Sequence, residues 1–191
     1  MDITAARSTA HSADALWATL EDIDQWAQWL PTVDSVARVG GPGVPGVGVA
    51  YELEQPGLPK ATWTITDWRP GVGFTWESRR PGVLTIATHE LVGESAGARI
   101  ELDIKWKGLL GRGVRMAFGA KTANFLRLEA EALDVTTQLA VAAGIMGVHY
   151  TWIRSRERLA CFKAFLHNNY VGAAIFAGIV VDFLVSGRSF G

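Results

Sequence analysis

Histidine is the side chain that most readily exchanges a proton near neutral pH, and His89 is the candidate among the four histidines of this sequence. His89 lies in a run with the alternating pattern of a β-strand, so Glu90 beside it points to the opposite face. If the face of His89 borders a ligand cavity, its imidazole could exchange a proton with a carbonyl-bearing ligand. The alternative is a structural histidine that is hydrogen-bonded to a cross-strand hydroxyl or carbonyl. The catalytic residues therefore stay unknown, with His89 as a candidate.

Other common arrangements of reactive residues are missing from the sequence. There is no GxSxG motif, and the single cysteine, Cys161, excludes an intramolecular disulfide, a CxxC pair and a thiolate zinc site. No group of His, Asp and Glu has the spacing of metal ligands. The glycine-rich run at 41–48 lacks the GK[ST] of a phosphate-binding loop and is interpreted as a loop at a cavity mouth. The sequence thus predicts neither a metal site nor a cofactor.

Aromatic residues provide the main argument for ligand binding. They alternate within strand-like runs, so a subset should line one face of a sheet, and two more lie in a helical run. Aromatic walls suit planar or prenylated ligands, since each ring buries about 150–250 Å² of surface. The alternative is that they form an ordinary core. With His89 included, the predicted ligand-binding residues are Trp63, Phe74, Trp76, His89, Trp106, Phe118 and Phe125.

The elements that must position these side chains can be recognised in residues 1–135. A strand-like segment at 1–10 is followed by helical patterns at 13–22 and 23–30, the second of which stops at Pro31. The period then changes to two in six strand candidates separated by Gly- and Pro-containing turns. The last of these, ARIELDIKWKG at 98–108, has one apolar and one charged face. A helical pattern follows from about 109 to 134.

Composition divides the chain into two parts. Of its 191 residues 49% are hydrophobic and the net charge is −1, which excludes a disordered chain and a basic nucleic-acid-binding surface. Residues 1–135 hold 30 charged side chains, whereas residues 136–191 hold only 7. The second part contains two charge-poor runs, 135–153 and 164–187, each long enough to cross a bilayer. The alternative is a pair of buried helices. We therefore expect two domains, 1–135 and 136–191, the second an apolar helical hairpin associated with a membrane.

The first part resembles the START-like (SRPBCC) superfamily, in particular its polyketide cyclase/dehydrase-type members. The phrases that carry the resemblance are SADALWATLEDIDQWAQWLPTVDSV, PGLPKATWTITDWRPGVGFTWES and LEAEAL. The resemblance implies an α+β helix-grip fold, in which a curved antiparallel sheet wraps around a long C-terminal helix, here followed by two apolar helices. It also implies a cavity for lipids, polyketides, quinones or other bulky hydrophobic molecules. Only some members are enzymes.

The tail at 136–186 resembles the last two helices of the 4-hydroxybenzoate polyprenyltransferase family, most specifically in FKAFLHNNYVGAAIF. Those enzymes bind Mg²⁺-diphosphate through aspartate-rich motifs on earlier helices. The tail holds one aspartate, Asp182, and one glutamate, Glu157, which cannot build such a site. The resemblance therefore implies a membrane hairpin without the catalytic apparatus.

Three functions remain open at this stage. The favoured one is binding, transport or sensing of a hydrophobic small molecule, such as a lipid, polyketide or prenylated quinone, by a domain tethered at a membrane. The second is a cyclase or dehydratase in which His89 and a strand Thr or Glu handle protons. The third is an inactive fusion that carries a polyprenyltransferase remnant. No nucleic-acid partner is expected.

Physical arguments about the orientation of the tail conflict. The basic residues between the two runs, from Arg154 to Lys163, favour a cytoplasmic loop, which would place the first domain outside if both runs spanned. No signal peptide is recognised and 30 charges oppose export, so we expect that domain at the cytoplasmic face. Residues 135–153 then would not span stably. Residues 170–185 are the better candidate to insert, with Asp182 near their far end.

Overall fold

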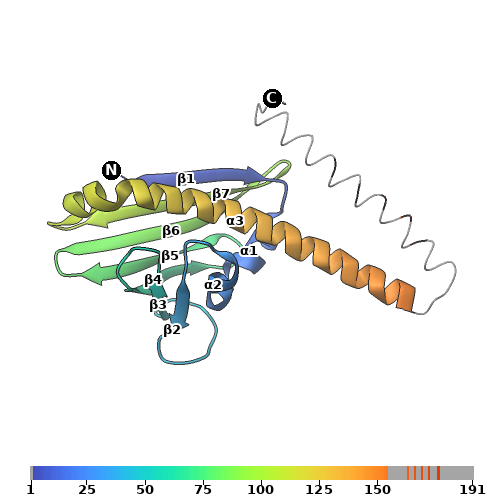
Figure 1. Cartoon of the computed structure of the whole chain (residues 1–191), viewed down its shortest axis with the longest axis horizontal. Coiled ribbons are helices and arrows are strands. Elements are labelled where there is room, and N and C mark those ends of the chain that lie inside the picture. The colour runs from blue at the N-terminus through green and yellow to red at the C-terminus, as the bar shows by residue number, and fades with distance from the viewer. Residues whose placement is uncertain are drawn as a thin grey trace. The chain divides into compact units, whose positions relative to one another are not determined.

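The structure is a computed structural model of the chain (Figure 1). It describes residues 2–154 and, in the tail, residues 163, 166, 169, 172 and 176. The chain divides into two compact units, residues 1–140 and 141–191, and each is described by itself. The predicted division into two functional domains at residue 135 stays a prediction.

The described residues contain one sheet of seven strands, three α-helices and a short 3-10 helix. Their order along the chain is β1 (Ile3–Thr9), α1 (Ala13–Leu20), η1 (Ile23–Gln25), α2 (Trp26–Trp29), β2 (Ser35–Arg38), β3 (Ala50–Glu54), β4 (Ala61–Arg69), β5 (Gly73–Arg80), β6 (Val83–Glu94), β7 (Gly97–Lys107) and α3 (Gly111–Arg154).

The sheet is antiparallel throughout, with the strand order β1-β7-β6-β5-β4-β3-β2. Strands β2 to β7 pair with their neighbours in sequence, as hairpins do, whereas β1 joins the far edge beside β7. The alternation that predicted β7 is confirmed, since Ile100, Leu102 and Ile104 are buried. The curved sheet with its long C-terminal helix confirms the predicted helix-grip α+β fold (Figure 1).

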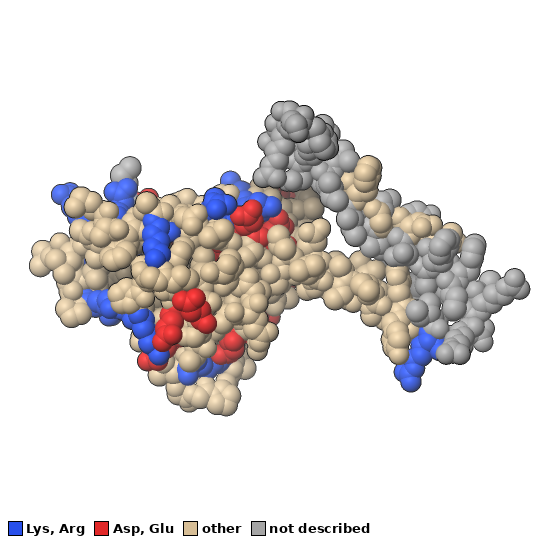
Figure 2. All heavy atoms as spheres, in the orientation of Figure 1, with Lys and Arg blue, Asp and Glu red and all other residues tan. Residues whose placement is uncertain are grey.

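Local signals in the sequence explain both short helices. Ser12 is the N-cap of α1, and its hydroxyl accepts a hydrogen bond from the amide of Ala15 (3.3 Å). The apolar stripe of α1 is buried against the sheet at Leu16 and Leu20. Helix α2 ends at Trp29, two residues before Pro31. Both helices therefore cover one face of the sheet. On the face of the first unit that Figure 2 shows, acidic and basic side chains are intermixed.

The sequence predicted two apolar helices in the tail, and for the first of them this prediction is wrong. The first apolar run, 135–153, is not a separate helix but the C-terminal part of α3, a single helix of 44 residues. No proline interrupts residues 111–154, so nothing in the backbone ends the helix at residue 135. Thr137 is 1% exposed, and its hydroxyl donates to the hydroxyl of Thr19 (3.1 Å). The second run, 164–187, lies outside the described residues except at four positions.

No helix in the described part of the chain is both long enough and apolar enough to cross a bilayer. The predicted transmembrane helix is therefore not supported within those residues.

Candidate ligand-binding cavity

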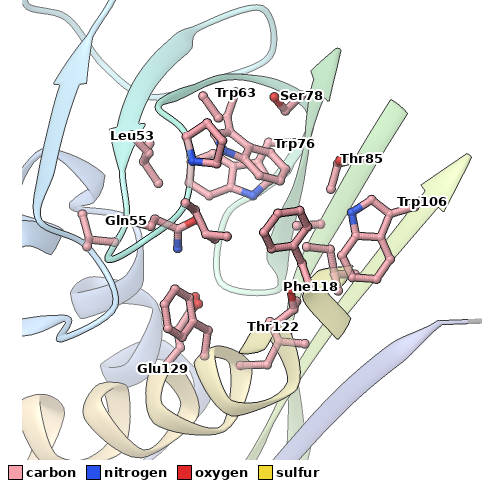
Figure 3. A pocket seen from close by; sticks show the side chains of 18 of the residues that line it. Leu53, Gln55, Trp63, Trp76, Ser78, Thr85, Trp106, Phe118, Thr122 and Glu129 are labelled. Carbon is pink, nitrogen blue, oxygen red and sulfur yellow. The ribbon is translucent and has the colours of Figure 1, made fainter. Parts of the chain in front are cut away.

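A cavity of about 220 Å³ lies between the sheet and α3 (Figure 3). Strands β3 to β7 provide one wall, α3 the opposite wall, and α2 with the segment after it one end. The lining consists of apolar and aromatic side chains with a few polar groups: Trp26, Leu30, Val33, Leu53, Gln55, Leu58, Pro59, Ala61, Trp63, Trp76, Ser78, Arg80, Val83, Thr85, Ala87, His89, Ile104, Trp106, Val114, Phe118, Thr122, Phe125, Leu126 and Glu129.

Six of the seven predicted ligand-binding residues line this cavity. They come from four neighbouring strands and from α3, and are Trp63, Trp76, His89, Trp106, Phe118 and Phe125. Phe74 does not line it, although it shares a strand face with Trp76. Phe74 is fully buried and stacks on the ring of His89, with 4.4 Å between centroids and 11° between planes. Contact of these side chains with a ligand stays a prediction.

His89 faces the cavity together with Thr85 and Ala87, as the period of two along β6 requires. Its Nε2 lies 2.8 Å from Oε1 of Glu129 on α3. The two side chains are only 4% and 10% exposed. The partner of His89 is thus a carboxyl group from the helix, not the cross-strand hydroxyl or carbonyl considered from the sequence.

Aromatic rings hold the imidazole of His89 in place. Phe74 stacks on one side, and the ring centroids of Trp26 and Trp76 lie 5.6 Å and 5.7 Å from that of His89. Both side chains are almost wholly buried, so the interaction between His89 and Glu129 is stronger than it would be at the surface. His89 Nδ1 has no hydrogen-bond partner within the described residues. The pair could hold or transfer a proton at the cavity wall, because one ring nitrogen is bound and the other is not.

The remaining ionisable lining residue is Arg80, which lies at an exposed position. Its guanidinium donates to the backbone carbonyls of Pro59 and Lys60. The interior of the cavity is therefore apolar apart from the His89–Glu129 pair and a few hydroxyl, amide and indole groups.

A second buried polar group, Tyr51 on β3, lies in the same core but does not line the cavity. Burial raises the pKa of Tyr51 to about 12, and the nearby carboxylate of Asp24 adds to the rise. Arg38 opposes it with its guanidinium 5.2 Å from the centre of the Tyr51 ring, but Arg38 also bonds to Asp24 (2.5 Å). Tyr51 is therefore a neutral phenol at physiological pH, not a base.

Sequence reasoning missed Glu129 as the partner of His89. A signal was present, since Glu129 falls on the buried stripe of α3, three residues after Leu126 and four before Leu133. A glutamate on an apolar stripe is rarely buried without a partner. Trp26 was also missed, because it was assigned only to the short second helix.

Solved structures share the fold at low sequence identity. Norcoclaurine synthase from Thalictrum flavum has a TM-score of 0.60 at 16% identity, with 73% of this chain and 95% of that chain covered. A hypothetical protein from Helicobacter pylori has a TM-score of 0.62 at 8% identity, covering 72% of this chain and 88% of that one. The di-domain ARO/CYC StfQ from the steffimycin biosynthetic pathway has a TM-score of 0.55 at 12% identity, covering 72% and 51%.

Curated relatives match a short segment only. The 4-hydroxybenzoate octaprenyltransferase of Dechloromonas aromatica is 80% identical over 51 residues, and that of Azoarcus sp. is 64% identical over 47 residues. These segments are 27% and 25% of this chain but only 17% and 16% of the two enzymes. The predicted resemblance of the tail to this family is confirmed, and this chain spans about a sixth of the length of these relatives.

The first part of the chain matches a family model described as polyketide cyclase / dehydrase and lipid transport, over residues 1–134. The match covers the whole sheet and the part of α3 that lines the cavity, and it agrees with the resemblance seen in the sequence. This chain belongs to the polyketide cyclase/dehydrase and lipid transport family.

Proposed function

We propose that residues 1–140 bind a hydrophobic small molecule between the sheet and α3, as a carrier or sensor that does not alter it. The observation that carries the proposal is the cavity lining, in which aromatic and aliphatic side chains surround a few polar groups, as in small-molecule sites generally. Binding would draw on apolar burial, about 25 cal/mol per Å² removed from water, less the cost of ordering the ligand.

The volume of the cavity limits what it holds. At about 220 Å³ it is smaller than the roughly 300–1,000 Å³ usual for drug-sized ligands. One or two fused rings would fit, whereas a long prenyl chain would have to extend out of the cavity. A polyketide or prenylated quinone would therefore place its ring system inside, and a lipid would place part of its apolar chain there. The octaprenyltransferase match of the tail supports a prenylated aromatic among these.

Organic extraction of the purified full chain, followed by mass spectrometry, tests the proposal directly. We expect an apolar aromatic or lipid to be co-purified with the wild type and to be lost from Thr85→Phe, which fills the cavity. Ile86→Phe is the matched control, because it adds the same ring on the opposite face of β6. Equal ligand content in both variants would contradict binding at this site.

The proposal includes attachment to the cytoplasmic face of a membrane through the tail. Its support is the low charge of residues 136–191 and their likeness to an enzyme family with membrane helices. In cell fractionation, the full chain should sediment with membranes and resist carbonate washing. Protease added to intact spheroplasts should leave residues 1–135 uncut; their digestion from outside would contradict the proposed side of the membrane.

A second candidate function, acid–base catalysis of cyclisation or dehydration, is favoured by the buried His89–Glu129 pair at the cavity wall. In such a reaction His89 would take a proton from the carbon between two carbonyl groups, and Glu129 would stabilise the resulting imidazolium. The test is the rate of aromatic product formation from a linear polyketone across pH, in the wild type and His89→Ala. A rate unchanged by this substitution would remove His89 from any mechanism.

A further inference from the structure

Buried polar atoms without a hydrogen-bond partner gather on the wall of the cavity. Within the described residues, three such atoms belong to its lining: Nε1 of Trp63, Nε1 of Trp76 and Nδ1 of His89. Buried polar groups are nearly always hydrogen-bonded in native proteins, and each exception calls for an explanation. The three residues share one cavity, so a ligand that displaces their rings on entry would supply hydrogen-bond partners to all three atoms.

The three side chains form a continuous row across neighbouring strands. Trp63 lies on β4, Trp76 on β5 and His89 on β6. The ring centroids of Trp63 and Trp76 are 5.2 Å apart, and those of Trp76 and His89 are 5.7 Å apart. Figure 3 shows Trp63 and Trp76 together on the sheet side of the cavity, across from Thr122 and Glu129 of α3. The three rings therefore lie close enough together for one ring-sized ligand to contact them.

The chemistry of the row determines what can satisfy it. An indole N–H only donates, so both tryptophans require acceptor atoms. His89 already uses Nε2 toward Glu129, and its Nδ1 accepts or donates according to which of the two residues holds the proton. Ketone, quinone or ester carbonyl oxygens can accept hydrogen bonds from the two indole N–H groups. A pure hydrocarbon can accept neither of these hydrogen bonds.

The charges around the cavity argue against an anionic ligand. Glu129 and His89 carry a net positive charge only if both are protonated, and Arg80 is at the exposed edge with its guanidinium on backbone carbonyls. Apart from Arg80 at the exposed edge, the lining offers no counter-charge to a carboxylate drawn inside, and burying that carboxylate would be costly. An uncharged ligand avoids this cost.

We infer that Trp63 and Trp76 are specificity-determining residues, whose indole N–H groups select an uncharged planar ligand with carbonyl oxygens. The inference rests on the proposed function, because it assigns the ligand class of the same cavity. It goes further in naming the two donors that distinguish a carbonyl-bearing ring system from a hydrocarbon of the same shape.

The experiment compares two ligands of matched shape on the purified full chain by equilibrium dialysis. 2,3-Dimethyl-1,4-naphthoquinone has two carbonyl oxygens, and 2,3-dimethylnaphthalene has the same carbon skeleton without them. Trp76→Phe removes the N–H and keeps an aromatic ring. It should weaken quinone binding about five-fold, the effect of one neutral hydrogen bond, and change hydrocarbon binding less than two-fold. The control is Trp68→Phe, a tryptophan outside the lining, which should change neither.

A spectroscopic measurement covers the case in which Trp76→Phe fails to fold, as judged by circular dichroism. The indole N–H resonances of the ¹⁵N-labelled wild type should include two that move downfield with the quinone but not with the hydrocarbon. Trp63→Phe should delete one of them.

The charge argument is tested with 2-naphthoate and its methyl ester, of which the ester should bind at least ten-fold more tightly.

The outcomes separate the two proposals. Failure of quinone, hydrocarbon and ester to bind would overturn the proposed function, and this inference with it. Binding of all three, with equal losses of quinone and hydrocarbon in Trp76→Phe or with no quinone-specific indole shift, would overturn the inference alone. Binding of 2-naphthoate as tight as that of its ester would overturn the preference for uncharged ligands.

Discussion

Nε2 of His89 on β6 and Oε1 of Glu129 on α3 lie 2.8 Å apart, although the residues are separated by 40 positions in the sequence. Both side chains are buried, and the contact joins the sheet to the helix across the cavity. It is therefore both part of the candidate site and a structural link between its two walls.

Removing one partner of this pair should cost more than removing both. His89→Leu leaves the Glu129 carboxyl buried without a partner, with an expected loss of about 3–5 kcal/mol of unfolding free energy. Glu129→Leu should also destabilise, and the double variant should lose less stability than either single variant. Urea denaturation of the four proteins measures this coupling. Additive losses would contradict a direct interaction between the side chains.

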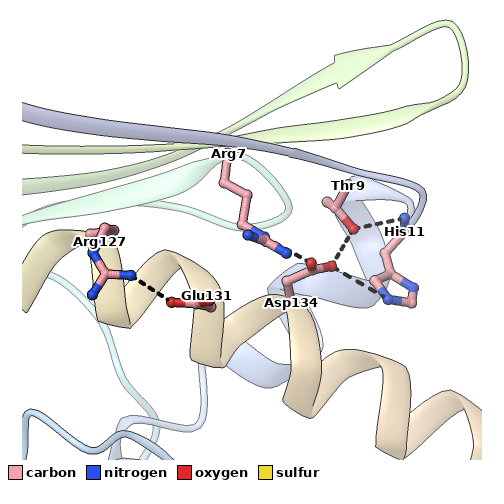
Figure 4. A network of polar contacts seen from close by, with 6 residues as sticks. All are labelled: Arg7, Thr9, His11, Arg127, Glu131 and Asp134. Atoms are coloured by element: carbon pink, nitrogen blue, oxygen red, sulfur yellow. Dashed lines mark hydrogen bonds and ion pairs between the residues drawn. The ribbon is translucent and has the colours of Figure 1, made fainter. Parts of the chain in front are cut away.

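A second contact between the sheet and α3 joins β1 to the helix and is centred on Asp134 (Figure 4). Its carboxylate accepts from Arg7 Nε at 2.9 Å and from the Thr9 hydroxyl at 2.5 Å, and Nε2 of His11 is 3.7 Å away. The Asp134 side chain is 19% exposed. Asp134→Ala should therefore lower the unfolding free energy by about 1.5–3 kcal/mol, the range for hydrogen bonds to a charged group.

Glu131→Ala is the matched control for Asp134→Ala on the same helix. Glu131 pairs with Arg127 at 2.9 Å, but both side chains are exposed, at 47% and 62%. Such pairs contribute little, so the change should stay within about 0.5 kcal/mol. Equal effects of Asp134→Ala and Glu131→Ala in thermal denaturation would contradict the role given to Asp134.

Stability in alkali should depend on Tyr51. Burial raises the pKa of Tyr51 from 10.0 to about 12, so above pH 10 the unfolded chain releases this proton before the folded chain does. The contribution of Tyr51 to stability is complete below pH 10 and is lost as the pH rises toward 12. Between pH 9 and 12 the wild type should lose about 2 kcal/mol more than Tyr51→Phe.

The same variant offers a control at neutral pH. The Tyr51 hydroxyl meets no partner at good hydrogen-bond distance and angle within the described residues, although the Arg38 guanidinium is close enough to lower its pKa, so Tyr51→Phe should change stability at pH 7 by less than about 1 kcal/mol. The measurement is guanidinium denaturation at each pH. Parallel stability curves for the two proteins up to pH 12 would show that burial does not hold Tyr51 in its neutral form.

Gly73 begins β5 at a position that no other residue can occupy without a shift of the backbone. Its φ is +150°, and an added Cβ would lie 2.1 Å from the backbone oxygen of His89. Gly73→Ala should therefore cost more than about 3 kcal/mol or prevent folding, and should disturb the strand that holds His89. Gly93→Ala is the control, since an added Cβ there meets no atom within 4 Å. Similar melting temperatures for both variants would contradict this account.

Patterns among residues that are close in the sequence predicted most of the fold. The strands follow from a period of two, the start of α1 from the cap at Ser12, and the end of α2 from the proximity of Pro31. Six of the seven residues proposed to bind ligand line the cavity, because alternation along a strand fixes which side chains share a face. Alternation also explains the exception: it placed Phe74 on the same face as Trp76 but could not say how far along the sheet the cavity extends.

The sequence by itself thus determined the α+β class, the faces of the strands and the family, since these depend on neighbours along the chain. Only the tertiary structure decided that α3 continues past residue 135 and that Glu129 is the partner of His89. It also decided that Trp63, Trp76 and His89 leave three polar atoms unpaired on one wall. Such relationships depend on how strands and helix pack together when they are far apart in the sequence. Periodicity assigns the faces of each element, but it does not say which residue of β6 lies next to which residue of α3.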